Sequence, residues 1–333
     1  MTEPTKTDPA DPMSRPRYVG LPTFMRAPYA EDDWSGVDIG LVGVPYDGGV
    51  TNRPGARHGP REVRNQSSLM RRINQATGVC PYELARVADI GDAVVERPFE
   101  LTGAHNQIQA FYERVAAAGV VPLSVGGDHS VSLPILRVLG RDRPVGMVHI
   151  DAHCDTGDDY LGSRFHHGAP FRRAVEEGVL DPKRTIQIGI RGGINDRDVW
   201  GFSHESGMRV VYMHEIPALG IDGVIAEARR VVGDGPTYLS FDIDSIDPAF
   251  APGTGTPEIG GLTSFEVRPG ARPVGRRRDR RRPGRGVAAV RCRRQHHAGR
   301  RDHPVRAAVR DSRGGGPAQA LRRLGARPAL RIP

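Results

Sequence analysis

Cysteine is scarce in this chain, which argues against a protein that is held together by disulfide bonds. The three cysteines among 333 residues, Cys80, Cys154 and Cys292, are widely spaced. A disulfide-stapled scaffold needs an even set of closely spaced cysteines, and this chain does not have one. The fold is therefore expected to depend on an ordinary hydrophobic core.

Long apolar runs and a targeting signal are also missing. The first residues are polar, acidic and proline-rich, so no secretory signal peptide is predicted. No apolar stretch reaches the roughly 20 residues that a membrane-spanning helix needs. We expect a cytoplasmic protein without a membrane partner.

Acidic and aromatic residues are nearly absent from the last part of the chain. Residues 268–333 contain 21 Arg and no Lys, against Asp279, Asp302 and Asp311, a formal charge of +18. Because the whole chain is +8, residues 1–267 carry −10. Such a tail could bind nucleic acid through phosphate contacts. Without aromatic side chains it would stack poorly on bases, so we do not expect nucleic acid as a partner.

The body of the chain alternates apolar strands with helical segments. The strand pattern is met at residues 38–44, 120–125, 145–150, 184–190, 209–213 and 237–241. Helices are predicted at residues 100–118, 130–139, 170–177 and 222–232. Strands that alternate with helices and are apolar throughout predict an α/β fold with a parallel sheet covered on both faces. We divide the chain into a flexible segment (1–16), a catalytic domain (17–267) and a tail (268–333).

Acidic and histidine residues follow three of the predicted strands. The segments are Gly126-Gly-Asp-His129, Asp151-Ala-His-Cys-Asp155 and Ser240-Phe-Asp-Ile-Asp244. Because side chains alternate along a strand, Asp151, His153 and Asp155 share one side and Cys154 points away. A lone Asp-x-Asp or Asp-x-His is usually a solvated loop. Three such clusters at strand ends instead predict a metal site.

The chemistry of these side chains favours two metal ions over one. Carboxylates with some imidazole suit Mn²⁺ first and Zn²⁺ second. Six ligands are too many for one structural zinc ion, but they suit two ions that share carboxylates. Two divalent ions and a hydroxide among four carboxylates leave a slightly negative site. That balance favours a cationic guanidinium over a phosphate ester as substrate.

These motifs, with Ser240-Phe-Asp-Ile-Asp-Ser-Ile-Asp-Pro-Ala-Phe-Ala-Pro-Gly-Thr-Gly255, resemble the ureohydrolase family of arginases, agmatinases and guanidino-acid hydrolases. The resemblance runs from about Arg17 to Val267. It implies a three-layer α/β/α fold with a mainly parallel, roughly eight-stranded sheet. It also implies two Mn²⁺ ions, one on His129, Asp151, Asp155 and Asp242, the other on His153, Asp151, Asp242 and Asp244. A trimeric or hexameric homo-oligomer is implied as well.

The resemblance also implies a reaction, in which an activated water attacks the guanidinium carbon and urea and an amine are released. Asp155 and His167 are the implied catalytic residues, and His167 would relay a proton to the leaving amine. Its neighbour His166 does not match the family position, and we interpret it as an ordinary surface or packing histidine.

The substrate tail stays open between an amine and an acid. The loop Tyr46–Pro60 resembles the agmatinase and guanidino-acid branch, and Arg53 or Asn52 could meet a carboxylate, as in 4-guanidinobutyrate or 3-guanidinopropionate. A solvent or subunit contact is an equal alternative for Arg53. Asp158-Asp-Tyr160 would instead favour an amine, as in agmatine.

The tail suggests an error of reading frame. Read one base forward, Arg277–Arg291 permits D-V-I-G-A-D-L-V-E-V-S-P-P-Y-D, which resembles the family's last strand and its guanidinium-holding Glu. We therefore interpret residues 268–333 as frameshifted and disordered, with the last strand and helix lost. The polypeptide as written is then expected to be poorly soluble and weakly active or inactive.

Two other functions are weighed against the ureohydrolase hypothesis. A zinc deacylase on a related fold would normally bind a single ion, and the second Asp of Asp242-x-Asp244 counts against it. An inactive protein with a basic, nucleic-acid-binding tail would bind no metal.

Overall fold

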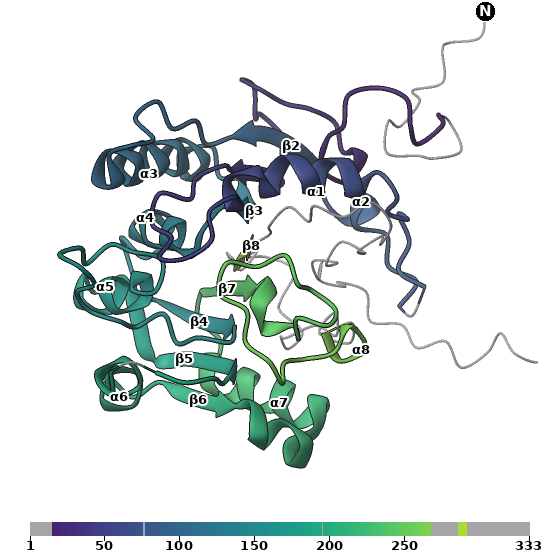
Figure 1. Ribbon diagram of the computed structural model, residues 1–333. Coiled ribbons are helices and arrows are strands. Elements are labelled where there is room, and N and C mark those ends of the chain that lie inside the picture. The colour runs from purple at the N-terminus through teal and green to yellow at the C-terminus, as the bar shows by residue number, and fades with distance from the viewer. Residues whose placement is uncertain (1–14, 76, 195, 268–285, 292–333) are drawn as a thin grey trace, which may run out of the picture.

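One parallel sheet forms the centre of this computed structural model, which describes residues 15–75, 77–194 and 196–267 and the backbone of residues 286–291 (Figure 1). Every neighbouring pair of its strands runs parallel, in the order β2-β1-β3-β8-β7-β4-β5-β6. The strands are β1 (Ile39–Val44), β2 (Val87–Asp92), β3 (Val121–Gly126), β4 (Val145–Ile150), β5 (Leu180–Ile190), β6 (Arg209–Tyr212), β7 (Thr237–Asp242) and β8 (Gly286–Arg291).

Helices cover both faces of this sheet (Figure 1). The α-helices are α1 (Gly59–Ser67), α2 (Pro81–Leu84), α3 (Leu101–Ala117), α4 (Ser132–Leu139), α5 (Pro170–Glu176), α6 (Asp198–Glu205), α7 (Ile216–Val232) and α8 (Ser264–Val267). Short 3₁₀ turns are η1 (Phe24–Arg26), η2 (Ala56–His58), η3 (His129–Val131), η4 (Met213–Glu215) and η5 (Ile243–Ser245).

The apolar side chains form a core on each side of the sheet. On one face, Tyr112 of α3, Leu136 of α4 and Phe171 of α5 are buried together with strand residues. On the other face, α7 packs Val224 and Ala228 against β5 and β6, and α1 contributes a second, smaller contact around β1. The three-layer α/β/α fold is thus confirmed. Within the described residues, no helix is long and apolar enough to cross a membrane.

Most predicted elements lie close to their observed bounds, but some were missed. β2, α1, α2, α6 and α8 were not predicted, and α7 begins earlier than expected. In α7, Gly220 has a positive φ of 64°, so the regular helix begins after it and agrees with the predicted 222–232 segment.

The structure corrects the prediction that the last strand is lost. Residues 286–291 form β8, which lies in the middle of the sheet between β3 and β7. Their sequence, Gly-Val-Ala-Ala-Val-Arg, contains small and β-branched residues that fit a parallel strand. β8 therefore joins β3 and β7 into one continuous sheet. The predicted disorder of residues 268–285 and 292–333 lies outside the described residues.

Candidate metal centre

The carboxyl ends of three strands bring the predicted metal ligands together. β3 leads into η3, β4 ends directly before Asp151, and β7 ends at Asp242. β4 and β7 are neighbours, and only β8 separates β7 from β3. Because parallel strands all end at the same edge of the sheet, the predicted side chains meet there. They are His129, Asp151, His153, Asp155, Asp242 and Asp244.

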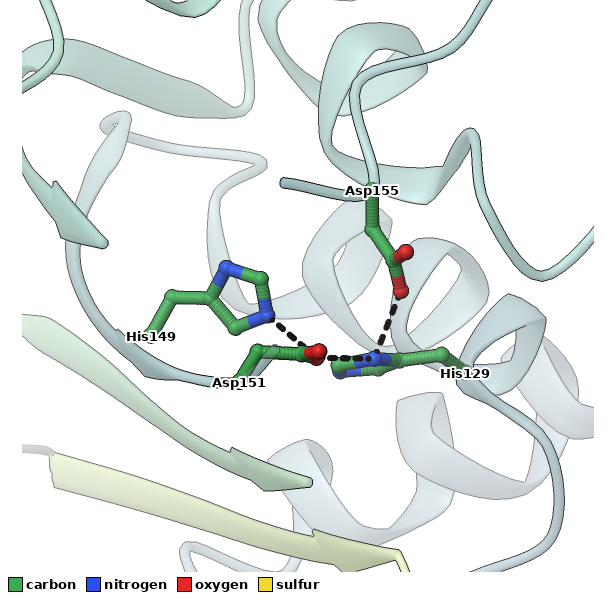
Figure 2. Close-up of side chains that lie close together, drawn as sticks. All are labelled: His129, His149, Asp151 and Asp155. Carbon is green, nitrogen blue, oxygen red and sulfur yellow. Dashed lines mark hydrogen bonds and ion pairs between the residues drawn. The ribbon is translucent and has the colours of Figure 1, made fainter. Parts of the chain in front are cut away.

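The imidazole of His129 faces three carboxylates at once. Its Nδ1 lies 2.8 Å from Asp155 Oδ2, 3.2 Å from Asp151 Oδ2 and 3.3 Å from Asp242 Oδ2. Figure 2 shows Asp151 and Asp155 approaching this nitrogen from different directions. Its Nε2 lies 2.7 Å from the Ser240 hydroxyl. One ring nitrogen carries at most one proton, so a point on which three carboxylates converge is typical of a cation site.

A second imidazole, that of His153, faces the other side of the Asp151 carboxylate. His153 Nδ1 lies 3.3 Å from Asp244 Oδ2 and 3.5 Å from Asp151 Oδ1. Its Nε2 lies 3.7 Å from Glu258 Oε1, at an ion-pair distance. Asp151 therefore directs one oxygen toward each histidine and joins the two halves of the site.

The local backbone holds these side chains in place. Asp151 Oδ1 accepts a hydrogen bond from the His153 amide at 2.8 Å, and Asp242 Oδ1 accepts one from the Asp244 amide at 3.0 Å. Asp155 has a positive φ of 50°, which is uncommon for a residue other than glycine. Such strained positions concentrate at functional sites.

Burial makes the charges of this cluster interact strongly. Asp151, Asp242 and Asp244 are fully buried. Burial, followed by the charges of Asp242 and Asp151, raises the pKa of Asp244 to about 8. Burial alone would lower the pKa of His153, but its contacts with Asp151 and Asp244 outweigh burial and raise that pKa to about 12. Protons on these groups thus partly neutralise the carboxylates.

The donor set fits a pair of divalent cations. Buried carboxylates need compensating charge, and carboxylate and imidazole donors suit hard or borderline ions. Cys154 offers no thiolate, because its side chain packs with Ile190 and Val210 and burial raises the pKa of the thiol to about 12. Cys154 therefore points away from the site, as predicted.

His167 lies next to the cluster, on the segment before α5. This segment is joined to the Asp155 turn, because Gly157 N donates to Gly168 O at 2.8 Å. The His167 side chain is buried, and its Nε2 lies 2.7 Å from the Thr51 hydroxyl. His166 instead contacts its own loop, with Nε2 3.2 Å from Asp158 O, in agreement with a packing role.

The loop after β1 lies across the strand end that carries His129. Gly127 has a positive φ of 69°, and a Cβ there would lie 2.4 Å from Tyr46 O, so glycine is required. Asp128 Oδ2 accepts a hydrogen bond from Gly49 N at 2.7 Å. Asn52 Nδ2 donates to Gly255 O at 2.8 Å, which ties this loop to the one after η5.

The charged groups of the loops beside the acidic cluster differ in how far they already form ion pairs. Asp158 contacts three guanidinium groups, from Arg164 at 3.1 Å, Arg173 at 2.8 Å and Arg172 at 3.4 Å. Arg53 is exposed and makes no ion pair with any part of the chain that the structure describes. Asp158 is thus already paired, whereas Arg53 and the exposed carboxylate of Asp159 make no ion pair within the described residues.

Some residues of the site were missed from the sequence. His149 Nε2 lies 2.8 Å from Asp151 Oδ2 (Figure 2), and Gln187 contacts the other side of this ring. Strand alternation could have identified His149, because it lies two residues before Asp151. The roles of Gln187 and Ser240 could be predicted only by knowing which strands pair with β4.

Comparison with known proteins identifies the family of this chain. The family model described as the arginase family matches residues 37–278. A guanidinopropionase from Pseudomonas aeruginosa is 59% identical over 260 residues, which cover 78% of this chain and 81% of the relative. A mitochondrial agmatinase from Gallus gallus is 45% identical over 252 residues, covering 75% of this chain and 74% of the relative.

Solved structures agree with this result. The proclavaminate amidino hydrolase of Streptomyces clavuligerus superposes with a TM-score of 0.75 and 38% sequence identity. The match covers 83% of this chain and 90% of that structure. The α/β fold of this chain therefore belongs to a known architecture.

Proposed function

Because the chain belongs to the arginase family, we propose that it is a metal-dependent hydrolase of linear guanidino compounds that releases urea and an amine. The observation that carries this proposal is the position of Asp151 between His129 and His153. A carboxylate with one oxygen toward each imidazole suits a two-metal site, and two-metal sites occur in hydrolases that cleave C–N bonds, such as aminopeptidases.

We propose Mn²⁺ as the metal, with two ions per chain. His129, Asp155, Asp151 and Asp242 would hold one ion, and His153, Asp244 and the same two shared carboxylates the other. Manganese suits this set because oxygen ligands outnumber nitrogen ligands. When bound, the two ions supply a water-derived nucleophile near neutral pH.

The protein's own residues orient the substrate and move a proton. With two divalent ions and a hydroxide bound, the four carboxylates would leave a small negative charge, which would attract a cationic guanidinium group. His167, buried beside the Asp155 turn, would deliver a proton to the departing amine nitrogen. Asp155 would hold a metal ion and fix the position of the attacking oxygen.

We propose an ω-guanidino acid rather than agmatine as the substrate. Asp158 is already paired with three arginines, so it has little charge left for an amine tail. Asn52 uses its amide on Gly255. Arg53 remains to bind a terminal carboxylate, as in 3-guanidinopropionate or 4-guanidinobutyrate.

Urea release after metal removal and reloading tests the function. The 333-residue chain and a chain read one base forward from codon 268 would be compared on 3-guanidinopropionate, 4-guanidinobutyrate and agmatine. We expect Mn²⁺-dependent urea release, greatest with an acid. One bound Zn²⁺ per chain would favour a deacylase instead, and no bound metal with no urea from either chain would favour a non-enzymatic protein.

We also propose a homo-oligomer, a trimer or hexamer, located in the cytoplasm and without a nucleic-acid partner. The support is the family to which the chain belongs. Light scattering of the purified protein tests the oligomeric state, and fractionation of the cells that make it tests the location.

A further inference from the structure

A row of three buried polar residues crosses the sheet directly beneath the acidic cluster. His149 of β4 is in register with Gln187 of β5 on one side and with Ser240 of β7 on the other. All three side chains are inaccessible to solvent. Residues paired across parallel strands point to the same face of the sheet, so this row supports the layer of metal ligands above it.

The contacts of Gln187 decide which nitrogen of His149 carries a proton. The Gln187 side-chain amide lies 2.6 Å from Cys154 O, which can only accept a hydrogen bond, so its NH₂ group must face that carbonyl. The same NH₂ lies 3.2 Å from His149 Nδ1. His149 Nδ1 is therefore an acceptor, and the ring proton belongs to Nε2.

His149 Nε2 is then a donor, and its acceptor is a metal ligand. It lies 2.8 Å from Asp151 Oδ2, the oxygen that also faces His129. The ring is fixed by Phe171, whose centroid lies 4.5 Å away, and by the edge of His129 at 5.3 Å. The ring therefore has one available orientation and one available proton.

We propose that His149 is a positioning residue that orients the shared carboxylate of Asp151, and that Gln187 sets the tautomer that it needs. This proposal rests on the proposed function, because it concerns the same two-metal site. His149 lies close enough to His129, Asp151 and Asp155 to be taken for a ligand. A protonated Nε2 has no lone pair to offer a metal, so His149 acts through Asp151 instead.

The proposal predicts that loss of the His149 hydrogen bond weakens the binding of both metal ions. Since Asp151 directs one oxygen to each half of the site, a misplaced carboxylate weakens both halves. Loss of such an outer hydrogen bond typically lowers metal affinity by about 10- to 100-fold. A direct ligand of one ion would instead remove that ion and leave the other.

Mn²⁺ titration of the metal-free, full-length protein by calorimetry tests this proposal. His149→Phe keeps the ring volume and removes the donor, whereas His149→Gln can place an amide N–H near Asp151. We expect His149→Phe to bind two ions with about 10- to 100-fold weaker affinity, and His149→Gln to recover most of that loss. The Mn²⁺ affinity of Gln187→Met should lie between the affinities of these two variants.

His105→Phe is the matched control, because His105 is also buried against aromatic rings but lies on α3, away from the ligands. Its substitution should leave Mn²⁺ affinity unchanged. Thermal melting shows whether each variant is folded. Wild-type affinity in His149→Phe, an equal loss in His149→Gln, or the loss of only one ion would each overturn the proposal.

The titration also separates this proposal from the proposed function. If the parent protein binds two ions but releases no urea, the function is wrong and the His149 result still decides the positioning role. If the parent protein binds no divalent ion, both are wrong.

Discussion

The hydroxyl of Thr51 lies 2.7 Å from Nε2 of His167, and this contact links the loop after β1 to the proposed proton relay. The backbone adds a second link, because His167 N donates to Gly49 O at 2.9 Å. The position of His167 therefore depends on a loop that also carries Arg53, the residue proposed to bind the carboxylate of the substrate.

Thr51→Val should impair turnover without weakening metal binding. The substitution keeps the shape of the side chain but removes the hydroxyl that orients the His167 ring. Since a general acid–base group contributes roughly 10²- to 10⁴-fold, we expect a misoriented relay to lower kcat about tenfold or more and to alter the pH–rate profile. Thr51→Ser, which keeps the hydroxyl, should behave like the parent enzyme. An unchanged kcat in Thr51→Val would remove this link from the mechanism.

Metal stoichiometry should respond to each acidic residue according to its position. Asp155→Asn affects only the His129 half and Asp244→Asn only the His153 half, so each variant should retain one tightly bound ion. Asp151→Asn should lose both, because Asp151 faces both histidines. Elemental analysis after gel filtration gives the number of ions per chain. Asp158→Asn is the control, since this carboxylate is paired with arginines outside the cluster.

The convergence of the predicted ligands could be foreseen because its signals are local. Each predicted ligand lies at or shortly after the end of an apolar strand, and the alternation of side chains predicted that Asp151 and His153 share a side while Cys154 points away, where it packs with Ile190 and Val210. The same rule applied to His149, but its place inside the apolar strand concealed it. Gln187 and Ser240 depend on which strands are neighbours, which no local pattern encodes.

Long-range contacts explain the other differences. The pairing of Asp158 with Arg172 and Arg173 comes from the packing of α5 beside the loop, so the sequence could not show that this carboxylate is already paired. β8 was missed because one short apolar run lies within an arginine-rich segment. Its place between β3 and β7 follows from the sheet as a whole.

The metal-free protein should lose stability as the pH rises from 7.0 to 8.5. Asp244, with a pKa raised to about 8, and His153, with a pKa raised to about 12, both bind protons more tightly in the folded state than in the unfolded chain. Stability from such groups is full below the unfolded pKa and is lost as the pH approaches the folded value. Each fully titrating group contributes about 1.4 kcal/mol per pH unit.

Thermal melting with a chelator and with Mn²⁺ measures this effect. We expect a lower Tm at pH 8.5 than at pH 7.0 without metal, and a larger gain on adding Mn²⁺ at pH 8.5, because the ions replace the protons. Asp244→Asn should reduce the dependence of the metal-free Tm on pH. A metal-free Tm that rises over this interval would contradict the charge balance of the site.

Arg53→Ala should change substrate preference more than turnover. If Arg53 binds the carboxylate tail, its loss removes a charge-assisted hydrogen bond worth about 1.5–3 kcal/mol, which is roughly ten- to a hundredfold in KM for 3-guanidinopropionate. Agmatine, with an amine tail, should lose nothing. Arg61→Ala, an exposed arginine on α1, is the control. Equal effects on acid and amine substrates would assign Arg53 to another role.

The reading frame of the coding DNA decides how complete this enzyme is. A missing or extra base near codon 268 would replace the arginine-rich tail by a segment that includes a guanidinium-holding Glu. The proposed ligands for both ions lie before residue 268, so the 333-residue chain and the restored chain should bind two Mn²⁺ alike. The restored chain alone should anchor the guanidinium, so its kcat/KM should exceed that of the 333-residue chain by tenfold or more, since a lost charge-assisted hydrogen bond costs roughly 1.5–3 kcal/mol. Resequencing codons 255–335 comes first. If the DNA confirms the arginine-rich frame, the frame hypothesis is wrong. Urea release by the 333-residue chain at a rate typical of enzymes, about 1–10³ per second, would then mean that the guanidinium is held without the Glu of the alternative frame.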